Sequence, residues 1–466
     1  MTVEPATGLD AWIARGAEMA DGAARARARA RTRRFDTIAV HGLYDHAAAA
    51  ANQGSLIEPA YLSPAQHFSD SNELEAALGY LMPAWGYTRL ANPTTHYLEE
   101  TLALLETYGT GLEASCVVTG SGMAAVHLAT NALLAVNPDM PMALPNIVAS
   151  AKCYGGTFML FTRYAAERGI DIRWITDPLD MAEWEQAIDG DTRFLYVEVP
   201  SNPALALADI PALAALAHGR GDGAGPMPLI VDSTVATPAL LRPLGLGADI
   251  VIHSLSKAIG SSGLAIAGAV IARRDIPVRV GSDGLRADFA TEVKLLPSRD
   301  LGPALSPFSA LMLLSDLRTL RTRMDAWSRT AMAVARFLDG HPAVASVAYP
   351  GLAEHPGHLV AARDFRLADG DDEGHEVARY STLMAFTLKG GIAAARRTFD
   401  RLEIVFRATD LGRVKSVAVI PSISTHQQQG EAGRATAQIA PGLIRLSIGG
   451  EHPADLVDDL GQALEG

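Results

Sequence analysis

Cysteine is nearly absent from this sequence, and charged residues are few for its length. Of 466 residues only Cys116 and Cys153 are cysteines, which excludes a disulfide framework and a cysteine-ligated zinc cluster. We expect both to be small buried apolar residues in a reducing cytoplasm, and we expect no bound metal. Charged residues make up 20% of the chain and hydrophobic residues 48%, which excludes a disordered protein and provides for a sizeable core in two or three domains.

Long apolar runs and net positive charge are also missing. No stretch approaches the roughly 18 apolar residues that a membrane-spanning helix requires, and the N-terminus lacks the apolar core of a secretion signal. We therefore expect no membrane partner and a cytoplasmic location. The net charge of −13 argues against nucleic acid as a main partner.

The most informative stretch is an apolar run that ends at a lysine. Residues 248–257 read Ala-Asp-Ile-Val-Ile-His-Ser-Leu-Ser-Lys, and Gly260-Ser261-Ser262-Gly263 follow. A lysine at the end of a buried strand must be hydrated, paired or chemically used, because an isolated buried ammonium is costly. Chemical use is the sharper hypothesis: Lys257 would form a Schiff base with a carbonyl cofactor, and the hydroxyls of Ser254 and Ser256 suit an anion such as phosphate.

A second apolar run ends in a carboxylate. Residues 228–232 read Pro-Leu-Ile-Val-Asp, and the distance from Asp232 to Lys257 fits one loop and one further strand. Pyridoxal phosphate (PLP) requires such a partner, because an anionic carboxylate keeps the pyridine nitrogen protonated and lets the ring act as an electron sink. The alternative is that Asp232 caps a turn and that Lys257 is a solvated residue at a strand end.

Two glycine-containing turns add groups that a phosphorylated ring needs. Gly120-Ser121-Gly122-Met123 lies between an apolar strand and a helix-like run, an arrangement in which backbone N–H groups bind phosphate. Tyr154 precedes Gly155-Gly156, so its ring could stack on a cofactor that approaches the backbone closely.

Apolar strands alternate with helical segments from about 110 to 272, which predicts a mainly parallel α/β sheet. Ligands of such sheets lie at the carboxyl ends of the strands. Glu198 and Asn202 also follow a strand-like run, so we expect them at the same edge as Asp232 and Lys257.

The N-terminal third is less regular. Residues 1–34 carry many arginines at alternate positions, which spreads their charge around a helix and favours a solvated or partly frayed arm over a tail that touches RNA or membrane. Residues 35–95 are rich in turn formers and are expected to wrap over another surface, and the helix that follows would be capped by Thr94 or Thr95.

Within this region Tyr87 and Arg89 alternate, so an extended backbone would present a phenol and a guanidinium on the same side. The pair either binds a phosphate or is an exposed arginine beside a packed tyrosine, and the pattern alone does not choose between the two.

The character of the chain changes after about residue 308. Residues 308–336 predict one long helix, or two with a bend, and residues 364–379 predict an exposed charged loop. Near the end, Arg445 interrupts an apolar alternation. It is either a strand-edge arginine or a bidentate clamp for a carboxylate.

Together these motifs resemble, over roughly residues 55–465 and in family order, the Cys/Met-metabolism family of PLP enzymes. The family includes cystathionine γ-synthase, cystathionine lyases, methionine γ-lyase and O-acetylhomoserine sulfhydrylase. The resemblance implies the aspartate-aminotransferase-like α/β fold, with a mainly parallel seven-stranded sheet and a smaller C-terminal α/β domain. It also implies a homotetramer of two tight dimers, with active sites at the dimer interface. We expect an N-terminal arm (1–91) that wraps the neighbouring subunit, a PLP-binding domain (92–307) and a C-terminal domain (308–466).

The same resemblance implies a role for each motif. Lys257 would be the Schiff-base lysine, Asp232 the partner of the pyridinium nitrogen, and Tyr154 the ring-stacking residue that also assists proton transfer. The phosphate would bind Gly122, Met123, Ser254 and Ser256, with Tyr87 and Arg89 supplied by the neighbouring subunit. Asn202 would lie near the cofactor hydroxyl, and Arg445, with Asp410 and Tyr87 nearby, would bind the substrate.

Within the family, the segments 154–157, 299–308 and 424–428 resemble the O-acetylhomoserine sulfhydrylase branch. Methionine γ-lyases usually carry a cysteine where Gly156 stands. The chain departs from its relatives at Gly260-Ser261-Ser262-Gly263, at Asp410, where many relatives have Ser or Asn, and at Ile420-Pro421-Ser422. The last two departures are expected on the substrate side of the site and therefore favour an unusual nucleophile or amino acid.

The expected reaction is PLP-dependent γ-replacement on O-acetyl- or O-succinyl-L-homoserine with a sulfur or other nucleophile. The runner-up is elimination of the methionine γ-lyase or cystathionine lyase type. A PLP-fold scaffold without activity is disfavoured, because Lys257, Asp232 and Arg445 are all present.

Overall fold

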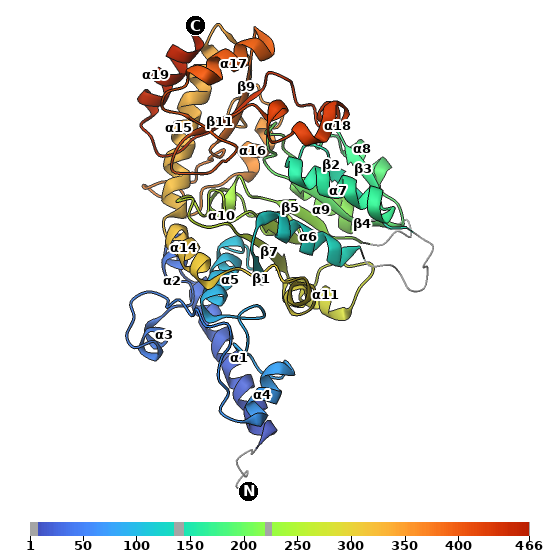
Figure 1. Ribbon diagram of the computed structural model, residues 1–466, viewed down its shortest axis with the longest axis vertical. Coiled ribbons are helices and arrows are strands. Elements are labelled where there is room, and N and C mark those ends of the chain that lie inside the picture. Colours follow the sequence, from blue (N-terminus) through green and yellow to red (C-terminus); the bar gives the residue numbers. More distant parts are fainter. Residues whose placement is uncertain (1–7, 135–143, 220–225, 466) are drawn as a thin grey trace.

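The computed structural model describes residues 8–134, 144–219 and 226–465, and it contains two β-sheets (Figure 1). The larger sheet has seven strands in the order β1-β7-β6-β5-β4-β2-β3. Strand β7 is antiparallel to both of its neighbours and the other pairs are parallel, so the predicted mainly parallel seven-stranded sheet is confirmed. The strands are β1 (Ala114–Thr119), β2 (Asn146–Ser150), β3 (Asp171–Ile175), β4 (Thr192–Glu198), β5 (Leu229–Asp232), β6 (Ile250–His253) and β7 (Gly268–Arg273).

Alternate residues of these strands build two separate cores, one on each face of the sheet. Leu229 and Val231 of β5 belong to one core and Ile230 to the other, as the two-residue side-chain period of a strand requires. A parallel sheet is covered on both faces, which is why its strands read as continuous apolar runs. The helices of this part of the chain are α5 (Pro93–Glu106), α6 (Gly122–Leu133), α7 (Gly155–Arg168), α8 (Met181–Ala187), α9 (Ile210–His218), α10 (Thr237–Leu240), α11 (Asp283–Ala287), α12 (Phe289–Val293) and α13 (Arg299–Leu301).

The N-terminus of α5 differs from the prediction. Asn92, not Thr94 or Thr95, is its cap, because the Asn92 side chain accepts a hydrogen bond from the Thr94 N–H and Pro93 begins the first turn. The Thr94 hydroxyl instead donates to the Pro59 carbonyl, which ties the preceding segment to this helix.

The smaller sheet, in the order β10-β11-β12-β9-β8, packs against α15, α17 and α19 around its own core. Its strands are β8 (Val344–Ala348), β9 (Leu383–Leu388), β10 (Phe406–Arg407), β11 (Val417–Val419) and β12 (Ile444–Ser447). The helices of this part are α14 (Pro307–Leu317), α15 (Leu320–Gly340), α16 (His358–Asp364), α17 (Gly391–Arg401), α18 (Gly430–Thr436) and α19 (Pro453–Leu464).

Two predictions for this part have different outcomes. Of the two alternatives predicted for residues 308–336, two helices with a bend is confirmed, since α14 ends at Leu317 and α15 begins at Leu320. The segment after α16 is irregular, as predicted, but it is only partly exposed. Phe365, Leu367 and Ala368 are buried in the main core, because apolar residues stand between the charged ones.

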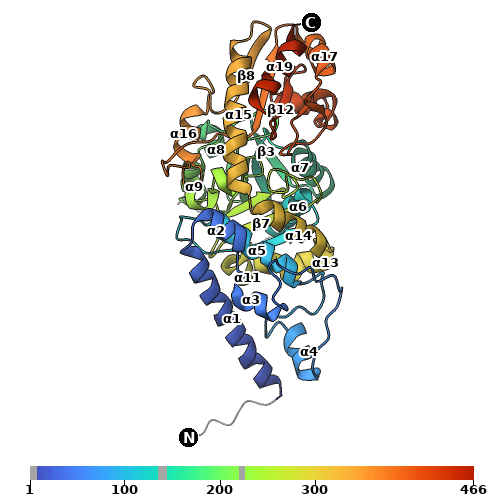
Figure 2. The same cartoon turned by 90° about the vertical axis from the view of Figure 1, so that its left-hand side faces the viewer.

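Four helices of the described residues precede α5, and α1 with α4 extends away from the rest of the molecule (Figure 2). They are α1 (Leu9–Arg31), α2 (Phe35–His41), α3 (His46–Ala51) and α4 (Ser71–Leu78). The expectation of a partly frayed arm is wrong for α1, which is continuous. Its end is held by ion pairs of Arg27 with Glu100 and of Arg31 with Glu113, long-range contacts that a local pattern does not reveal. Across the described ranges, no helix has the length and apolar character needed to span a bilayer.

Candidate active site

A cavity of about 410 Å³ opens at the carboxyl ends of β4, β5 and β6 and is closed on one side by the C-terminal part of the chain. All predicted site residues except Tyr87 and Arg89 line it. They are Gly122, Met123, Tyr154, Asn202, Asp232, Ser254, Ser256, Lys257, Asp410 and Arg445.

Lys257 stands in the turn directly after β6. Its side chain is 27% exposed, and its Nζ donates a hydrogen bond of 2.7 Å to Asp410 Oδ1. The loop that carries Asp410 passes against the lysine backbone: a Cβ on Gly412 would lie 2.4 Å from the Ala258 nitrogen. Gly412 also has a φ of +70°, so glycine is required there on two counts.

Two buried carboxylates lie side by side beneath the lysine. Glu198 and Asp232 end neighbouring strands in register. Asp232 Oδ1 accepts from the Thr234 N–H at 3.0 Å, and Oδ2 accepts from the Tyr196 hydroxyl at 3.3 Å. Burial raises the pKa of Asp232, and burial together with the Asp232 charge raises the pKa of Glu198 well above its usual range. A cationic ring nitrogen placed in the cavity would stabilise the Asp232 carboxylate.

The start of α6 forms a narrow cradle beside the end of β6. Ser121 caps this helix, and a Cβ on Gly122 would lie 2.7 Å from Ser254 Cβ. Only glycine at position 122 therefore lets the N-terminus of α6 approach Ser254 this closely. Backbone N–H groups at a helix N-terminus favour anions. Ser256 also lines the cavity, but its hydroxyl already exchanges hydrogen bonds with the Ala267 backbone.

Tyr154 stands at the entrance to α7 and is 40% exposed. Its backbone N–H donates to Glu198 Oε2 at 2.6 Å, which fixes this loop to the sheet. A Cβ on Gly156 would lie 2.5 Å from Tyr154 Cε1 and 3.1 Å from Met123 Sδ. The tyrosine ring thus lies where a side chain at position 156 would stand.

Arg445 of β12 is only 1% exposed. It donates to Asn202 Oδ1 at 2.9 Å and to the Asp410 carbonyl at 2.6 Å, while its buried Nε has no hydrogen-bond partner among the described residues. Burial lowers the pKa of Arg445 to about 10. The guanidinium therefore keeps its charge at neutral pH, and its Nε–H remains available to an anion.

This geometry agrees with the known proteins to which the chain is similar. Residues 36–465 match the family described as Cys/Met metabolism PLP-dependent enzyme. The chain belongs to this family.

The most similar relatives carry out more than one reaction. An L-methionine γ-lyase of Pseudomonas deceptionensis is 34% identical over 92% of this chain and 97% of the relative. An O-acetyl-L-homoserine sulfhydrylase of Leptospira meyeri is 31% identical over 92% of this chain and 96% of the relative. A solved Campylobacter jejuni protein, assigned as an O-acetylhomoserine (thiol)-lyase and containing pyridoxyl-lysine monophosphate, has 32% identity and a TM-score of 0.80 over 93% of this chain and all (100%) of the neighbour.

The protein is therefore a PLP-dependent enzyme with an aspartate-aminotransferase-like fold that acts on a small amino-acid substrate, as predicted. The residues present fit the cofactor. A buried carboxylate of raised pKa, Asp232, is available for a ring nitrogen, and the glycine cradle at Gly122 leaves room for a phosphate. The unpaired Arg445 Nε remains for a carboxylate.

Tyr87 and Arg89 lie apart from this cavity. The Arg89 guanidinium lies 5.5 Å from the centre of the Tyr87 ring and donates to the Arg299 carbonyl. The two side chains lie close together, but the extended backbone assumed in the prediction is wrong, because the Leu90 and Ala91 N–H groups bind the Tyr87 carbonyl in a turn. Tyr87 is 43% exposed.

Sequence reasoning did not single out Arg413, which lines the cavity and binds the Asp410 carboxylate through its Nε. The sequence did hold a signal for this contact, because Asp410 and Arg413 carry opposite charges three residues apart. Of the departures from the family pattern, Asp410 lines the cavity, whereas Ser262 binds Asp316 and Ile420 is buried in the C-terminal core.

The two cysteines are buried, as expected, and burial raises the pKa of Cys116 and Cys153 well above the usual range. Neither is a nucleophile at neutral pH.

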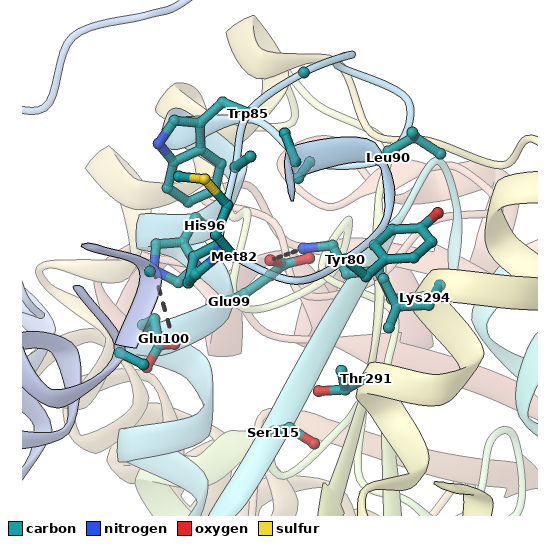
Figure 3. Close-up of a pocket in the computed structure, with 18 of the residues that line it drawn as sticks. Tyr80, Met82, Trp85, Leu90, His96, Glu99, Glu100, Ser115, Thr291 and Lys294 are labelled. Carbon is teal, nitrogen blue, oxygen red and sulfur yellow. Dashed lines mark hydrogen bonds and ion pairs between the residues drawn. The ribbon is translucent and has the colours of Figure 1, made fainter. Parts of the chain in front are cut away.

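A second and larger cavity, of about 560 Å³, lies between α1, α4, α5 and Lys294 (Figure 3). Lys294 Nζ donates to Glu99 Oε2 at 2.5 Å, and Arg27 binds Glu100 through two hydrogen bonds of 2.7 Å each. Because these charges pair with one another, we assign no chemistry to this cavity.

Proposed function

We propose that the protein catalyses γ-replacement on O-acetyl- or O-succinyl-L-homoserine with a sulfur nucleophile. The observation that carries this choice is the missing side chain at Gly156, whose space the Tyr154 ring occupies. Methionine γ-lyases, by the resemblance described above, usually have a cysteine here. That cysteine would force the Tyr154 ring into another position, so the present ring position favours the sulfhydrylase branch.

The roles of the chain's own residues follow from their placement. PLP, when bound, supplies an electron sink for the charge left on the substrate carbon. Lys257 would hold the cofactor aldehyde, and its amine would carry the proton that leaves Cα. Asp232 would keep the ring nitrogen protonated. The Tyr154 hydroxyl would pass a proton to the leaving oxygen or take one from the incoming thiol.

Arg445 would clamp the substrate carboxylate, and Arg445→Lys tests this role. Lysine cannot keep the bonds to Asn202 and Asp410 while it also binds a carboxylate in bidentate fashion. We expect KM for the homoserine ester to rise by about 10- to 100-fold, because charge-assisted hydrogen bonds are lost. An unchanged KM in a variant with wild-type thermal stability would contradict the clamp.

Gly156→Cys tests the branch assignment. The new Cβ would displace the Tyr154 ring, and a catalytic group displaced by about 1 Å costs on the order of 100-fold in rate. We expect the rate of γ-replacement to fall by that factor. The ratio of 2-oxobutyrate to the replacement product, measured in one reaction, should rise. If the product ratio stays the same, Gly156 has no part in the choice of reaction.

We also propose that Tyr87 and Arg89 bind the phosphate in the neighbouring copy of a homotetramer. The division into an arm (1–91) that wraps this neighbour and two domains (92–307 and 308–466) belongs to the same proposal. Tyr87 and Arg89 are exposed and lie outside the chain's own cavity, which supports a phosphate site shared between copies. Lys257→Ala and Arg89→Ala should each be inactive alone but regain activity when the two variants are co-expressed. In a mixed dimer, one site then combines Lys257 of the Arg89→Ala copy with Arg89 of the Lys257→Ala copy. Mixed oligomers without activity would refute the shared site.

The substrate experiment separates the candidate reactions. Purified protein is given O-acetyl- or O-succinyl-L-homoserine with sulfide and, separately, methionine or cystathionine without a nucleophile. We expect a sulfur-containing amino acid from the esters. The runner-up, elimination, is supported by the similarity to methionine γ-lyases, and 2-oxobutyrate with ammonia as the main products in the presence of sulfide would establish it. The cytoplasmic location stays a prediction.

A further inference from the structure

Asp410 makes three polar contacts with its carboxylate. Oδ1 accepts from Lys257 Nζ at 2.7 Å and from the Leu411 N–H at 2.9 Å, and Oδ2 accepts from Arg413 Nε. The Asp410 and Lys257 side chains are 31% and 27% exposed. The carboxylate is thus shared between the lysine and an arginine from its own loop.

The loop around Asp410 is held in place by contacts outside this ion pair. The Gly412 N–H donates to Ser447 Oγ at 2.9 Å, and Gly412 packs directly on the Ala258 backbone. Arg413 Nη1 donates to the Gly260 carbonyl at 2.9 Å. The carboxylate is therefore fixed beside the amine by backbone packing.

The ionisation of Asp410 is consistent with a persistent ion pair. Burial alone would raise the pKa of Asp410, but hydrogen bonds from Lys257, Arg413 and the Leu411 N–H outweigh it and leave the pKa below its ordinary value. The carboxylate is therefore charged at neutral pH.

We propose that Asp410 holds Lys257 as an ammonium ion in the cofactor-free protein, that Arg413 weakens this hold by competing for the same carboxylate, and that the pair together sets the rate of cofactor capture. This inference rests on the proposed function only in taking Lys257 as the residue that binds the aldehyde.

The chemistry of capture explains the effect. The lysine nitrogen forms a double bond to the aldehyde carbon while the carbon–oxygen double bond breaks. Starting from an ammonium, two hydrogens leave with the oxygen as water and the third passes to a base as a proton. Only the neutral amine can attack the carbon, so an anion that stabilises the ammonium slows capture.

The other charged or ionisable groups around the cavity do not replace Asp410. They are Tyr154, Glu198, Asp232 and Arg445. Glu198 binds the Tyr154 and Asn202 N–H groups, and Arg445 binds the Asp410 carbonyl, not its carboxylate. None of these groups has a hydrogen bond to Lys257 Nζ in the described part of the chain.

The test follows absorbance while cofactor-stripped protein takes up saturating PLP. We expect Asp410→Asn, which keeps the shape and removes the charge, to capture PLP about tenfold faster than wild type in dilute salt, where charges act over the longest range. Arg413→Gln should have the opposite effect and slow capture severalfold, because the carboxylate is then left to Lys257 alone. The ratio of the Asp410→Asn rate to the wild-type rate should fall as salt is raised from about 0.01 M to 1 M.

A matched control is Asp316→Asn. Asp316 accepts hydrogen bonds from Ser262 in the loop after Lys257 but does not line the cavity, so its capture rate should equal that of wild type. Equal rates for Asp410→Asn and wild type, or faster capture by Arg413→Gln, would overturn the inference, even if γ-replacement is established. Failure of wild type to take up PLP at all would instead refute the assignment of Lys257.

Discussion

Replacing Lys257 by alanine should abolish turnover, with a loss of about 10⁴-fold or more, while the protein stays folded. The amine is both the anchor for the cofactor and the proton carrier, and a general base alone contributes about 10²–10⁴-fold. The side chain is partly exposed and its one ion pair is with a partly exposed aspartate, so its removal costs little stability. Turnover of O-acetyl-L-homoserine and thermal unfolding should be measured on the same preparation.

Lys389→Ala is the matched control, because Lys389 is exposed and lies outside the cavity. It should retain wild-type turnover. A Lys257→Ala protein that keeps even a tenth of the wild-type rate would exclude this lysine from the chemistry.

Replacing Asp232 by asparagine should lower turnover by about 10³-fold without preventing cofactor binding. The amide keeps the shape of the side chain and an acceptor for the Thr234 N–H, but it cannot hold a proton on the ring nitrogen. The carboxylate is buried, and the neighbouring Glu198 carboxylate is already engaged by the Tyr154 and Asn202 N–H groups, so Glu198 should not take over its role.

This prediction has a readout that separates it from misfolding. Asp232→Asn should still take up PLP with the absorbance of a bound aldehyde, yet exchange of the substrate α-proton with deuterium should slow along with turnover. If exchange continues at the wild-type rate, the carboxylate does not support the electron sink.

The parts of the site that follow strand ends could be predicted from sequence. Asp232 and Lys257 end apolar strands, and the carboxyl ends of parallel strands meet at one edge, so the cavity that contains both follows from pattern alone. Gly122 and Tyr154 follow from the same rule, because each stands in a strand-to-helix turn.

The rest depends on contacts between distant segments. The Ser256 hydroxyl suits an anion by its residue type, but the backbone of Ala267, the residue before β7, already satisfies it. Arg413 reaches the cavity only because its loop packs on the turn after Lys257. Helix α1 is held by the ion pair of Arg27 with Glu100, which lie far apart in sequence. The arginine pattern of the helix alone therefore predicts a solvated arm and cannot reveal this contact.

The most direct measurement locates the cofactor's covalent attachment. Purified protein is incubated with PLP, reduced with borohydride and digested, and the pyridoxyl mass is assigned to a lysine by mass spectrometry. We predict that the label is found on Lys257 and that Lys257→Ala loses it. A label confined to Lys152, Lys294, Lys389 or Lys415, or no label in protein saturated with PLP, would contradict the account.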